Sequence, residues 1–223
     1  MTHRNTEHRP IDSKPVVILG GGGHASVLID LLQKINRPIE ALLDDDPNKL
    51  GSTFAGLTIT AGLDTVTQYQ RSDVELVNAL GSTHRPTARQ TLYEKMIARG
   101  YTFATLIHPS AIIAPQAIIE QGVQVMAGTI IQTNAALKQN CLINTAATID
   151  HDTVVGEHTH IAPGVTVCGN VTIGSACHVG AGATLIQGLT VAAGAVVGAS
   201  STVLSDIAAN EVVFGTPATA QKR

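Results

Sequence analysis

Between residues 107 and 203 the hydrophobic positions recur every six residues. The series has seventeen members, all of them branched aliphatics: Ile107, Ile113, Ile119, Val125, Ile131, Leu137, Ile143, Ile149, Val155, Ile161, Val167, Ile173, Val179, Leu185, Val191, Val197 and Val203. Neither a helix of 3.6 residues per turn nor an alternating strand produces this period. Short strands and tight turns stacked on identical units do. The pattern therefore predicts a parallel β-solenoid with triangular coils of 18 residues, into which the seventeen aliphatics point.

A second series, two residues before the first, holds mostly small side chains. It includes Cys141 and Cys177, which lie 36 residues apart, so we expect both thiols to be buried in the prism and without chemistry. No aromatic residue occurs between Phe103 and Phe214. The interior is therefore predicted to be narrow and to accept aliphatic and small side chains but no rings.

Residues 15–103 follow another pattern, in which short apolar runs at 15–20, 40–43 and 74–81 alternate with helical spacing at 26–35 and 86–100. This alternation is typical of a small parallel sheet of Rossmann type. Gly20, Gly22 and Ala25 fit the G-x-G-x-x-G/A fingerprint, and Asp44 and Asp45 follow at the distance expected for ribose recognition. A nucleotide or nucleotide-sugar site is predicted here, and a glycine turn that binds nothing is the alternative.

Composition narrows the class of ligand. The 223-residue chain has 14 basic and 17 acidic residues, which gives no electrostatic footprint for nucleic acid or an anionic membrane. The polar segment 1–14 resembles no secretory signal, and no stretch approaches the roughly 20 apolar residues of a membrane-spanning helix. Three cysteines without C-x-x-C spacing are typical of reduced thiols. We expect a cytoplasmic protein that acts on a small molecule.

The six-residue pattern resembles the [LIV]-[GAED]-x-x-[STAV]-x signature of hexapeptide-repeat acyltransferases, continuously over residues 107–203. This resemblance implies a left-handed β-helix and a homotrimeric assembly with active sites between subunits. The repeat alone indicates neither the handedness nor the oligomeric state.

The fusion of a glycine-loop domain to this repeat is similar to the sugar O/N-acyltransferases of the PglD and NeuD type. The matching segments are GGGGHA (20–25), LLDDD (42–46), ALG (79–81), INTAATIDHD (143–152), GEHTHIAPG (156–164), CGNVTIG (168–174) and FGTPA (214–218). The resemblance implies a Rossmann-like nucleotide-sugar-binding domain at 15–106 and a left-handed β-helix acetyltransferase domain, with a C-terminal tail, at 107–223. It implies acetyl-CoA-dependent acetylation of the amine of a nucleotide-linked 4-amino-4,6-dideoxy sugar for surface glycan or glycoprotein synthesis, with a UDP-linked, bacillosamine-type acceptor favoured.

The same resemblance makes His151 the catalytic base, followed by Asp152. A sugar ammonium must lose a proton before its nitrogen attacks the thioester, and imidazole titrates near neutral pH. His151 lies two residues after inward Ile149, at an outward turn position. Because neighbouring residues of a strand point to opposite faces, Asp152 can meet the ring only if the chain turns there.

The resemblance also supplies binding residues. Those for acetyl-CoA are His160, Gly169, Gly180, Ala181, Ala199 and Pro217, with the Gly169 N–H donating to the developing oxyanion, and Lys222 and Arg223 are candidates for a CoA phosphate. Those for the sugar nucleotide are Gly22, Gly23 and His24 at the diphosphate, Asp44 and Asp45 at the uridine and ribose, Gly81, and Asn144 near the acceptor. His24 is a candidate donor to a phosphate oxygen, and His158 and His178 are predicted to be exposed surface.

Other functions stay open at this point. Zinc sites in solenoids of the γ-class carbonic anhydrases contain a His-x4-His pair, whereas the spacings among the histidines at 151, 158, 160 and 178 are 7, 2 and 18, so we expect no metal. A GDP-perosamine-type N-acetyltransferase, a sugar O-acetyltransferase and a non-enzymatic trimeric binding or scaffold module are the alternatives.

Overall fold

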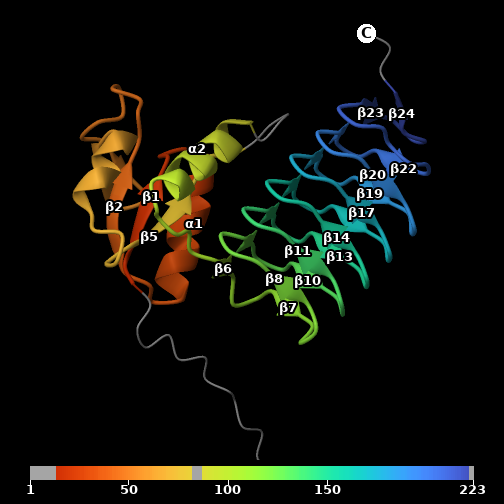
Figure 1. Ribbon diagram of the computed structural model, residues 1–223, viewed down its shortest axis with the longest axis horizontal. Helices are drawn as coiled ribbons and strands as arrows, with labels where there is room; N and C mark the ends of the chain where they lie inside the picture. The colour runs from red at the N-terminus through yellow and green to blue at the C-terminus, as the bar shows by residue number, and fades with distance from the viewer. Residues whose placement is uncertain (1–13, 82–86, 221–223) are drawn as a thin grey trace, which may run out of the picture.

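The computed structural model describes residues 14–81 and 87–220. The polar segment up to residue 13 and the terminal Lys222 and Arg223 lie outside the described residues. Figure 1 shows an α/β domain formed by the first part of the chain and, beside it, a stack of coils that leads toward the C-terminus.

The N-terminal domain is a five-stranded sheet in the order β3–β4–β2–β1–β5. Its elements are β1 (Val16–Leu19), α1 (Gly23–Lys34), β2 (Ile39–Leu43), β3 (Thr53–Phe54), β4 (Leu57–Ala61), the 3-10 helix η1 (Leu63–Gln68), β5 (Glu75–Asn78) and α2 (Thr87–Ala98). The predicted strands and helices are present. The pattern did not predict β3, β4 or η1, because residues 51–70 have no continuous apolar run.

Strand β1 is the central strand of this sheet. Its four residues are fully buried, and they alternate between two clusters, with Val16 and Ile18 packing on the α1 side and Val17 and Leu19 on the α2 side. The strand is a continuous apolar run because both faces of the sheet are covered. The chain continues from β1 to β2 on one side and reaches β5 on the other, so the glycine loop after β1 lies at the switch point where such sheets bind ligands.

The rest of the chain forms three parallel sheets, which are the faces of a prism. Face 1 contains β6 (Leu106–Ile107), β9 (Gln124–Val125), β12 (Leu142–Ile143), β15 (His160–Ile161), β18 (His178–Val179), β21 (Val196–Val197), β23 (Val212–Phe214) and β24 (Thr219–Ala220). Face 2 contains β7 (Ile112–Ile113), β10 (Ile130–Ile131), β13 (Thr148–Ile149), β16 (Thr166–Val167), β19 (Thr184–Leu185) and β22 (Thr202–Val203). Face 3 contains β8 (Ile118–Ile119), β11 (Ala136–Leu137), β14 (Val154–Val155), β17 (Thr172–Ile173) and β20 (Thr190–Val191).

Strands of one face pair in parallel with the strand 18 residues further along. The pairs include Ile131 with Ile149, Val155 with Ile173 and Ile161 with Val179. Only β24 runs antiparallel among the described solenoid strands, since it returns along β23 at the last coil. The predicted 18-residue coil is confirmed.

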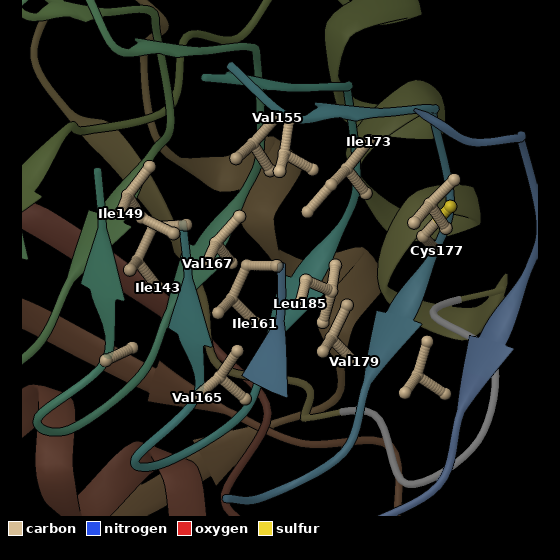
Figure 2. Packing of buried hydrophobic residues seen from close by; sticks show 14 of the residues in the cluster. Ile143, Ile149, Val155, Ile161, Val165, Val167, Ile173, Cys177, Val179 and Leu185 are labelled. Atoms are coloured by element: carbon tan, nitrogen blue, oxygen red, sulfur yellow. The ribbon is translucent and has the colours of Figure 1, made fainter. Parts of the chain in front are cut away.

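The prism interior is aliphatic, as Figure 2 shows for one part of it. From Val125 to Val203 every sixth-residue aliphatic is at most 2% exposed, and Cys141 and Cys177 are fully buried, as predicted. The first coil differs: Ile107 is 38% exposed, and Ile113 and Ile119 are half-buried. The inward prediction is wrong for Ile107 and incomplete for the other two, because no coil covers the open end of the prism.

The faces meet at corners, which we call corner 1–2, corner 2–3 and corner 3–1 after the faces they join. Every sixth residue from 122 to 200 lies at a corner and has a φ between 54° and 74°. This left-handed conformation favours glycine and, among side-chain-bearing residues, asparagine and aspartate. Ala146, His158, Ala176 and Ser200 nevertheless adopt it.

The two domains share a hydrophobic seam. Leu106, Met126 and Leu142 of the solenoid belong to the same buried cluster as Ala25 and Leu28 of α1. Across residues 14–81 and 87–220, no helix is long and apolar enough to cross a membrane.

Candidate active site

The glycine loop leaves open space at the start of α1. A Cβ at Gly20 or Gly21 would come within 2.8 Å or 2.6 Å of Leu80 or Ile59 side-chain atoms, whereas a Cβ at Gly22 or Gly23 would meet no atom within 4 Å. Gly22 is the N-cap residue, and no side chain caps the helix. The first N–H groups of α1 are therefore available to a ligand, and the helix dipole favours an anionic one.

The two predicted ribose carboxylates already have partners within the chain. Asp44 accepts hydrogen bonds from the backbone N–H of Gly21 (2.6 Å) and Asp46 (2.8 Å) and from Lys49 (3.1 Å). Burial raises the pKa of Asp44, but these donors outweigh it and the pKa is lowered. Asp45 accepts from the Leu63 N–H at 2.7 Å. Asp44 thus holds the shape of the glycine loop, whatever further contact either carboxylate makes.

His24 lies at the seam rather than in open solvent. Its Nε2 is 2.9 Å from Oε1 of Gln124, a residue of β9 that is 1% exposed. Gln124 also donates to the carbonyl of Asn78 at 2.9 Å. Arg89 of α2 donates to the same carbonyl at 2.7 Å and is 1% exposed. No sequence motif pointed to Asn78, Arg89 or Gln124.

His151 and Asp152 form a hydrogen-bonded pair at corner 2–3. The chain turns at this point, because Asp152 has a φ of 58°, and its Oδ2 lies 2.8 Å from Nδ1 of His151. Asn134, one coil earlier, donates to the other carboxylate oxygen at 2.9 Å. A carboxylate accepts only, so Nδ1 carries the proton and Nε2 is left as the basic atom.

Pairing raises the pKa of His151 and lowers the pKa of Asp152, as proton transfer to the histidine requires. The hydrogen bond to Asp152 is the main cause of a raised pKa for His151, and the Asp150 charge adds to it. The pKa of Asp152 is lowered, first by Asn134 and then by His151. Both side chains are about half exposed, 54% and 50%, so a substrate can reach them.

Gly169 lies beside the His151 ring. A Cβ at this position would be 2.5 Å from Cε1 and from Nε2 of His151, which is too close for any side chain. Within the part of the chain that the structure describes, the Gly169 N–H donates to no protein acceptor. The glycine therefore leaves room for the ring and keeps an N–H without a protein acceptor next to it.

The remaining predicted residues gather on corner 1–2 and the adjoining edge of face 1. Asn144 and His160 are in contact there, with Nδ2 and Nε2 3.2 Å apart. Gly180 and Ala181 lie on the same corner two coils after Asn144, and Ala199 and Pro217 follow in the next two turns of the chain. A Cβ at Gly180 would be 2.5 Å from the Ala199 nitrogen, so the two coils touch through their backbones. Within one chain the structure does not bring this group together with His151, which occupies corner 2–3.

Two histidine predictions are wrong. His158 and His178, expected to be exposed, are 7% and 8% exposed. His158 lies against the edge of Tyr93 of α2 and bonds Asn140 at 3.0 Å, because the N-terminal domain covers corner 3–1. His178 pairs with the His160 ring at 5.0 Å along face 1. The six-residue phase identifies outward positions but not the outward positions that another domain or ring covers.

Three cavities of the structure contain none of the predicted site residues. One of about 530 Å³ lies beside η1 and Tyr101, one of about 240 Å³ lies at the last coil, and one of about 620 Å³ lies at the open first coil beside Ile107. The described residues contain no group of three or more His, Cys, Asp or Glu side chains that could hold a metal ion. In a single chain the predicted site residues of the solenoid therefore lie on two separate corners, 1–2 and 2–3, and outside these three cavities.

Comparison with known proteins agrees with this geometry. Residues 15–96 match the family described as the PglD N-terminal domain. UDP-N-acetylbacillosamine N-acetyltransferase of Bacillus subtilis (strain 168) is 35% identical over 119 residues, which are 51% of this chain and 52% of that protein, so the match spans about half of that relative.

Among the solved structures that match nearly the whole chain are the following two. The acetyltransferase domain of PglB from Neisseria gonorrhoeae FA1090 has a TM-score of 0.88 and 31% identity, over 94% of this chain and 100% of that one. PerB from Caulobacter crescentus, solved in complex with CoA and GDP-perosamine, has a TM-score of 0.86 and 32% identity, over 93% and 97%.

A glycine-loop α/β domain joined to a left-handed parallel β-helix places the chain in the class of hexapeptide-repeat acyltransferases. Identity above 30% over nearly the entire chain identifies the family more closely. The chain belongs to the PglD-type family of sugar acyltransferases, and the predicted family and fold class are confirmed.

Proposed function

We propose that the protein transfers the acetyl group of acetyl-CoA to the amine of a nucleotide-linked 4-amino-4,6-dideoxy sugar. The observation that carries the proposal is the His151–Asp152 pair, with its basic Nε2 beside the Gly169 N–H. The relatives named UDP-N-acetylbacillosamine N-acetyltransferase and PerB support the reaction class. The acceptor sugar would serve surface glycan or glycoprotein synthesis.

The reaction proceeds by direct attack in a ternary complex. The sugar amine adds to the thioester carbonyl, and His151 Nε2 takes the proton that the nitrogen loses. The C–S bond then breaks to give the amide and the CoA thiolate, which takes up that proton to become the thiol. The Gly169 N–H donates to the carbonyl oxygen as negative charge develops there. Asp152 keeps the ring in the required tautomer and stabilises its cation.

A covalent acetyl-enzyme at either of the two buried thiols is disfavoured. Burial raises the pKa of Cys141 to about 12 and also raises the pKa of Cys177. Such thiols are not ionised near neutral pH and are inert nucleophiles.

Binding divides between the two domains in this proposal. Gly22, Gly23 and His24 lie at the diphosphate, Asp44, Asp45 and Gly81 contact the nucleoside, and Asn144 lies near the acceptor amine. Acetyl-CoA follows corner 1–2 along His160, Gly180, Ala181, Ala199 and Pro217. Residues 15–106 would then be the sugar-nucleotide domain and residues 107–223 the acetyltransferase domain.

A homotrimer would bring His151 of one chain to corner 1–2 of the next, since these lie on different corners of one chain. We also propose a cytoplasmic location, because the three cysteines are free thiols.

The nucleotide is the least determined part of the substrate. A UDP-linked acceptor is favoured by the bacillosamine relative, and a GDP-linked acceptor is the second candidate because of the similarity to PerB. Release of CoA should be measured with matched panels of UDP-linked and GDP-linked amino sugars and with their 4-hydroxy analogues. Turnover of hydroxy analogues alone would replace N-acetylation by O-acetylation, and turnover of none would leave a binding module.

His151→Ala tests the base. General-base catalysis contributes about 10²- to 10⁴-fold, so kcat should fall by that order while the assembly stays intact. Gel filtration and the KM for acetyl-CoA are the controls. Unchanged turnover in a folded variant would exclude His151 as the base.

A further inference from the structure

His24 joins the two domains through one hydrogen bond. It is the second residue of α1, beside the glycine loop, and its Nε2 contacts Oε1 of Gln124 in β9 of the solenoid at 2.9 Å. Gln124 is 1% exposed, so solvent does not compete for its amide. The protonation of His24 Nε2 therefore depends on whether the Gln124 amide presents its oxygen or its NH₂ group to the ring.

The neighbours of Gln124 fix the orientation of its amide. Its Nε2 lies 2.9 Å from the carbonyl oxygen of Asn78, which also receives a hydrogen bond from Arg89 at 2.7 Å. A carbonyl oxygen can only accept, so Gln124 must turn its NH₂ toward Asn78. The opposite orientation would set two oxygens against each other in a buried place. Oε1 therefore faces His24 and requires a proton on Nε2.

A second proton on the His24 ring is disfavoured by its surroundings. Burial, followed by the positive charge of Arg89 from α2, lowers the pKa of His24 to about 4, against a smaller opposing effect of the Gln124 hydrogen bond. Strands β9 and β5, which also pack here, contribute only the neutral amide groups of Gln124 and Asn78. Neutral imidazole carries a single N–H, so Nδ1 is left as a lone pair.

We propose that Gln124 is a positioning residue of the nucleotide-sugar site, which holds His24 as the Nε2-protonated neutral imidazole and makes its Nδ1 a hydrogen-bond acceptor. The proposal rests on the proposed function and changes one part of it. A phosphate oxygen at neutral pH only accepts, so His24 does not donate to the diphosphate through Nδ1. The loop N–H groups supply those donors, and His24 selects a hydroxyl or amide N–H of the same ligand.

The tautomer can be measured without any substrate. Nitrogen NMR of the full-length protein labelled in histidine, with His24 assigned by loss of its signals in His24→Ala, should show a protonated Nε2 and a bare Nδ1. The state should stay constant between pH 6 and pH 8. A proton on Nδ1, or titration within this range, would overturn the proposal. The result does not depend on which acceptor sugar is correct, so it separates this proposal from the proposed function.

Gln124→Leu tests the positioning role. Loss of the acceptor should release the ring into two tautomers and raise KM for the nucleotide sugar by about tenfold, the value of one hydrogen bond of about 1.4 kcal/mol. The kcat and the KM for acetyl-CoA should stay within about twofold, because His151 and corner 1–2 are untouched. If neither the tautomer of His24 nor the KM for the nucleotide sugar changed, the positioning role of Gln124 would be rejected.

Met126→Leu is the matched control. Met126 lies in the same buried apolar cluster two residues further on, so a volume-conserving change should leave both the tautomer and KM as they are. If it moved KM as far as Gln124→Leu does, the effect would be one of domain packing, and the positioning role would be rejected.

Discussion

At the scale of single residues, the corner that carries His151 depends on three neighbours. Asp152 turns into the left-handed region and meets the ring, Asn134 holds the second carboxylate oxygen, and Gly169 leaves space for the imidazole. The 18-residue period places Asn134 one coil before Asp152, but the period alone does not indicate that their side chains form a hydrogen bond. The contact of Asp152 with His151 was foreseen only as a condition, because sequence does not tell where a strand gives way to a turn.

Asp152→Asn should move the pH profile of the reaction. The raised pKa of His151 means that the base becomes protonated, and activity is lost, as pH falls through that value. Without the carboxylate the pKa of His151 falls, so the acid limb of kcat/KM should shift to lower pH. The less basic and less oriented ring should also lower kcat by about 10-fold or more. Asparagine tolerates the left-handed φ, so the fold is kept. An acid limb that stays in place would show that another group sets it.

Gly169→Ala should reduce kcat with little change in stability. The new methyl would lie 2.5 Å from Nε2 of His151, so the exposed ring must move, while the backbone N–H proposed for the oxyanion is retained. We expect a loss of about 10- to 100-fold, as for other misplaced catalytic groups. Cys168→Ala, one residue earlier, is the control and should keep wild-type turnover. Full activity of Gly169→Ala would mean that the ring position seen here is not the one used in catalysis.

At the scale of elements, each hexapeptide has two side chains that point into the prism and one corner residue with a left-handed φ. In one repeat these are Ala147, Ile149 and Asp152. Sequence predicted these inward rows almost completely, since each depends only on the six-residue phase. It did not predict the exposure of Ile107 at the open end or the cover over His158, because those depend on what stands next to the element. Gln124 and Arg89 escaped notice for the same reason: their meaning comes from the packing of α2 and β5 against face 1.

Alanine-to-glycine changes at two positions of the hexapeptide should have opposite signs. Ala176 has a φ of 54°, where an alanine is strained by roughly 1–2 kcal/mol, so Ala176→Gly should gain about 0.5 kcal/mol after the entropy cost of glycine. Ala183 is fully buried in an inward row, and Ala183→Gly should lose about 1 kcal/mol or more. Urea unfolding of both variants measures the difference. Equal effects would contradict a strained corner.

At the scale of the whole molecule, the site is divided between corners that one chain does not bring together. Family segments spread along the sequence predicted both groups of residues, but periodicity alone cannot show that His151 and the row from Asn144 to Pro217 lie on different corners. The two groups are separated because His151 follows a strand of face 2, whereas Asn144 follows a strand of face 1. The assignment of strands to faces becomes visible only in the three-dimensional structure.

Mixed trimers should regain activity from two inactive chains. His151→Ala removes the base, and Ala181→Trp should block the exposed surface of corner 1–2. If each site combines His151 of one chain with corner 1–2 of its neighbour, every mixed trimer holds one intact site, or about one third of wild-type activity. Heterotrimers isolated with two different tags can be assayed for CoA release. No recovery in such trimers would mean that one chain supplies both groups.

On face 1, residues that are 18 apart in the sequence lie on neighbouring parallel strands, so their distance in space follows from the number of coils between them. Gln124, Leu142 and His160 stand in one row, each a single strand spacing of about 4.8 Å from the next. The span from the His24 anchor to His160 is therefore counted in whole coils. Insertion of 18 residues would lengthen this span by one step and keep every aliphatic in phase, whereas insertion of six would carry His160 to another face. The distance along face 1 between the His24 contact at Gln124 and His160 can thus change only in steps of one coil.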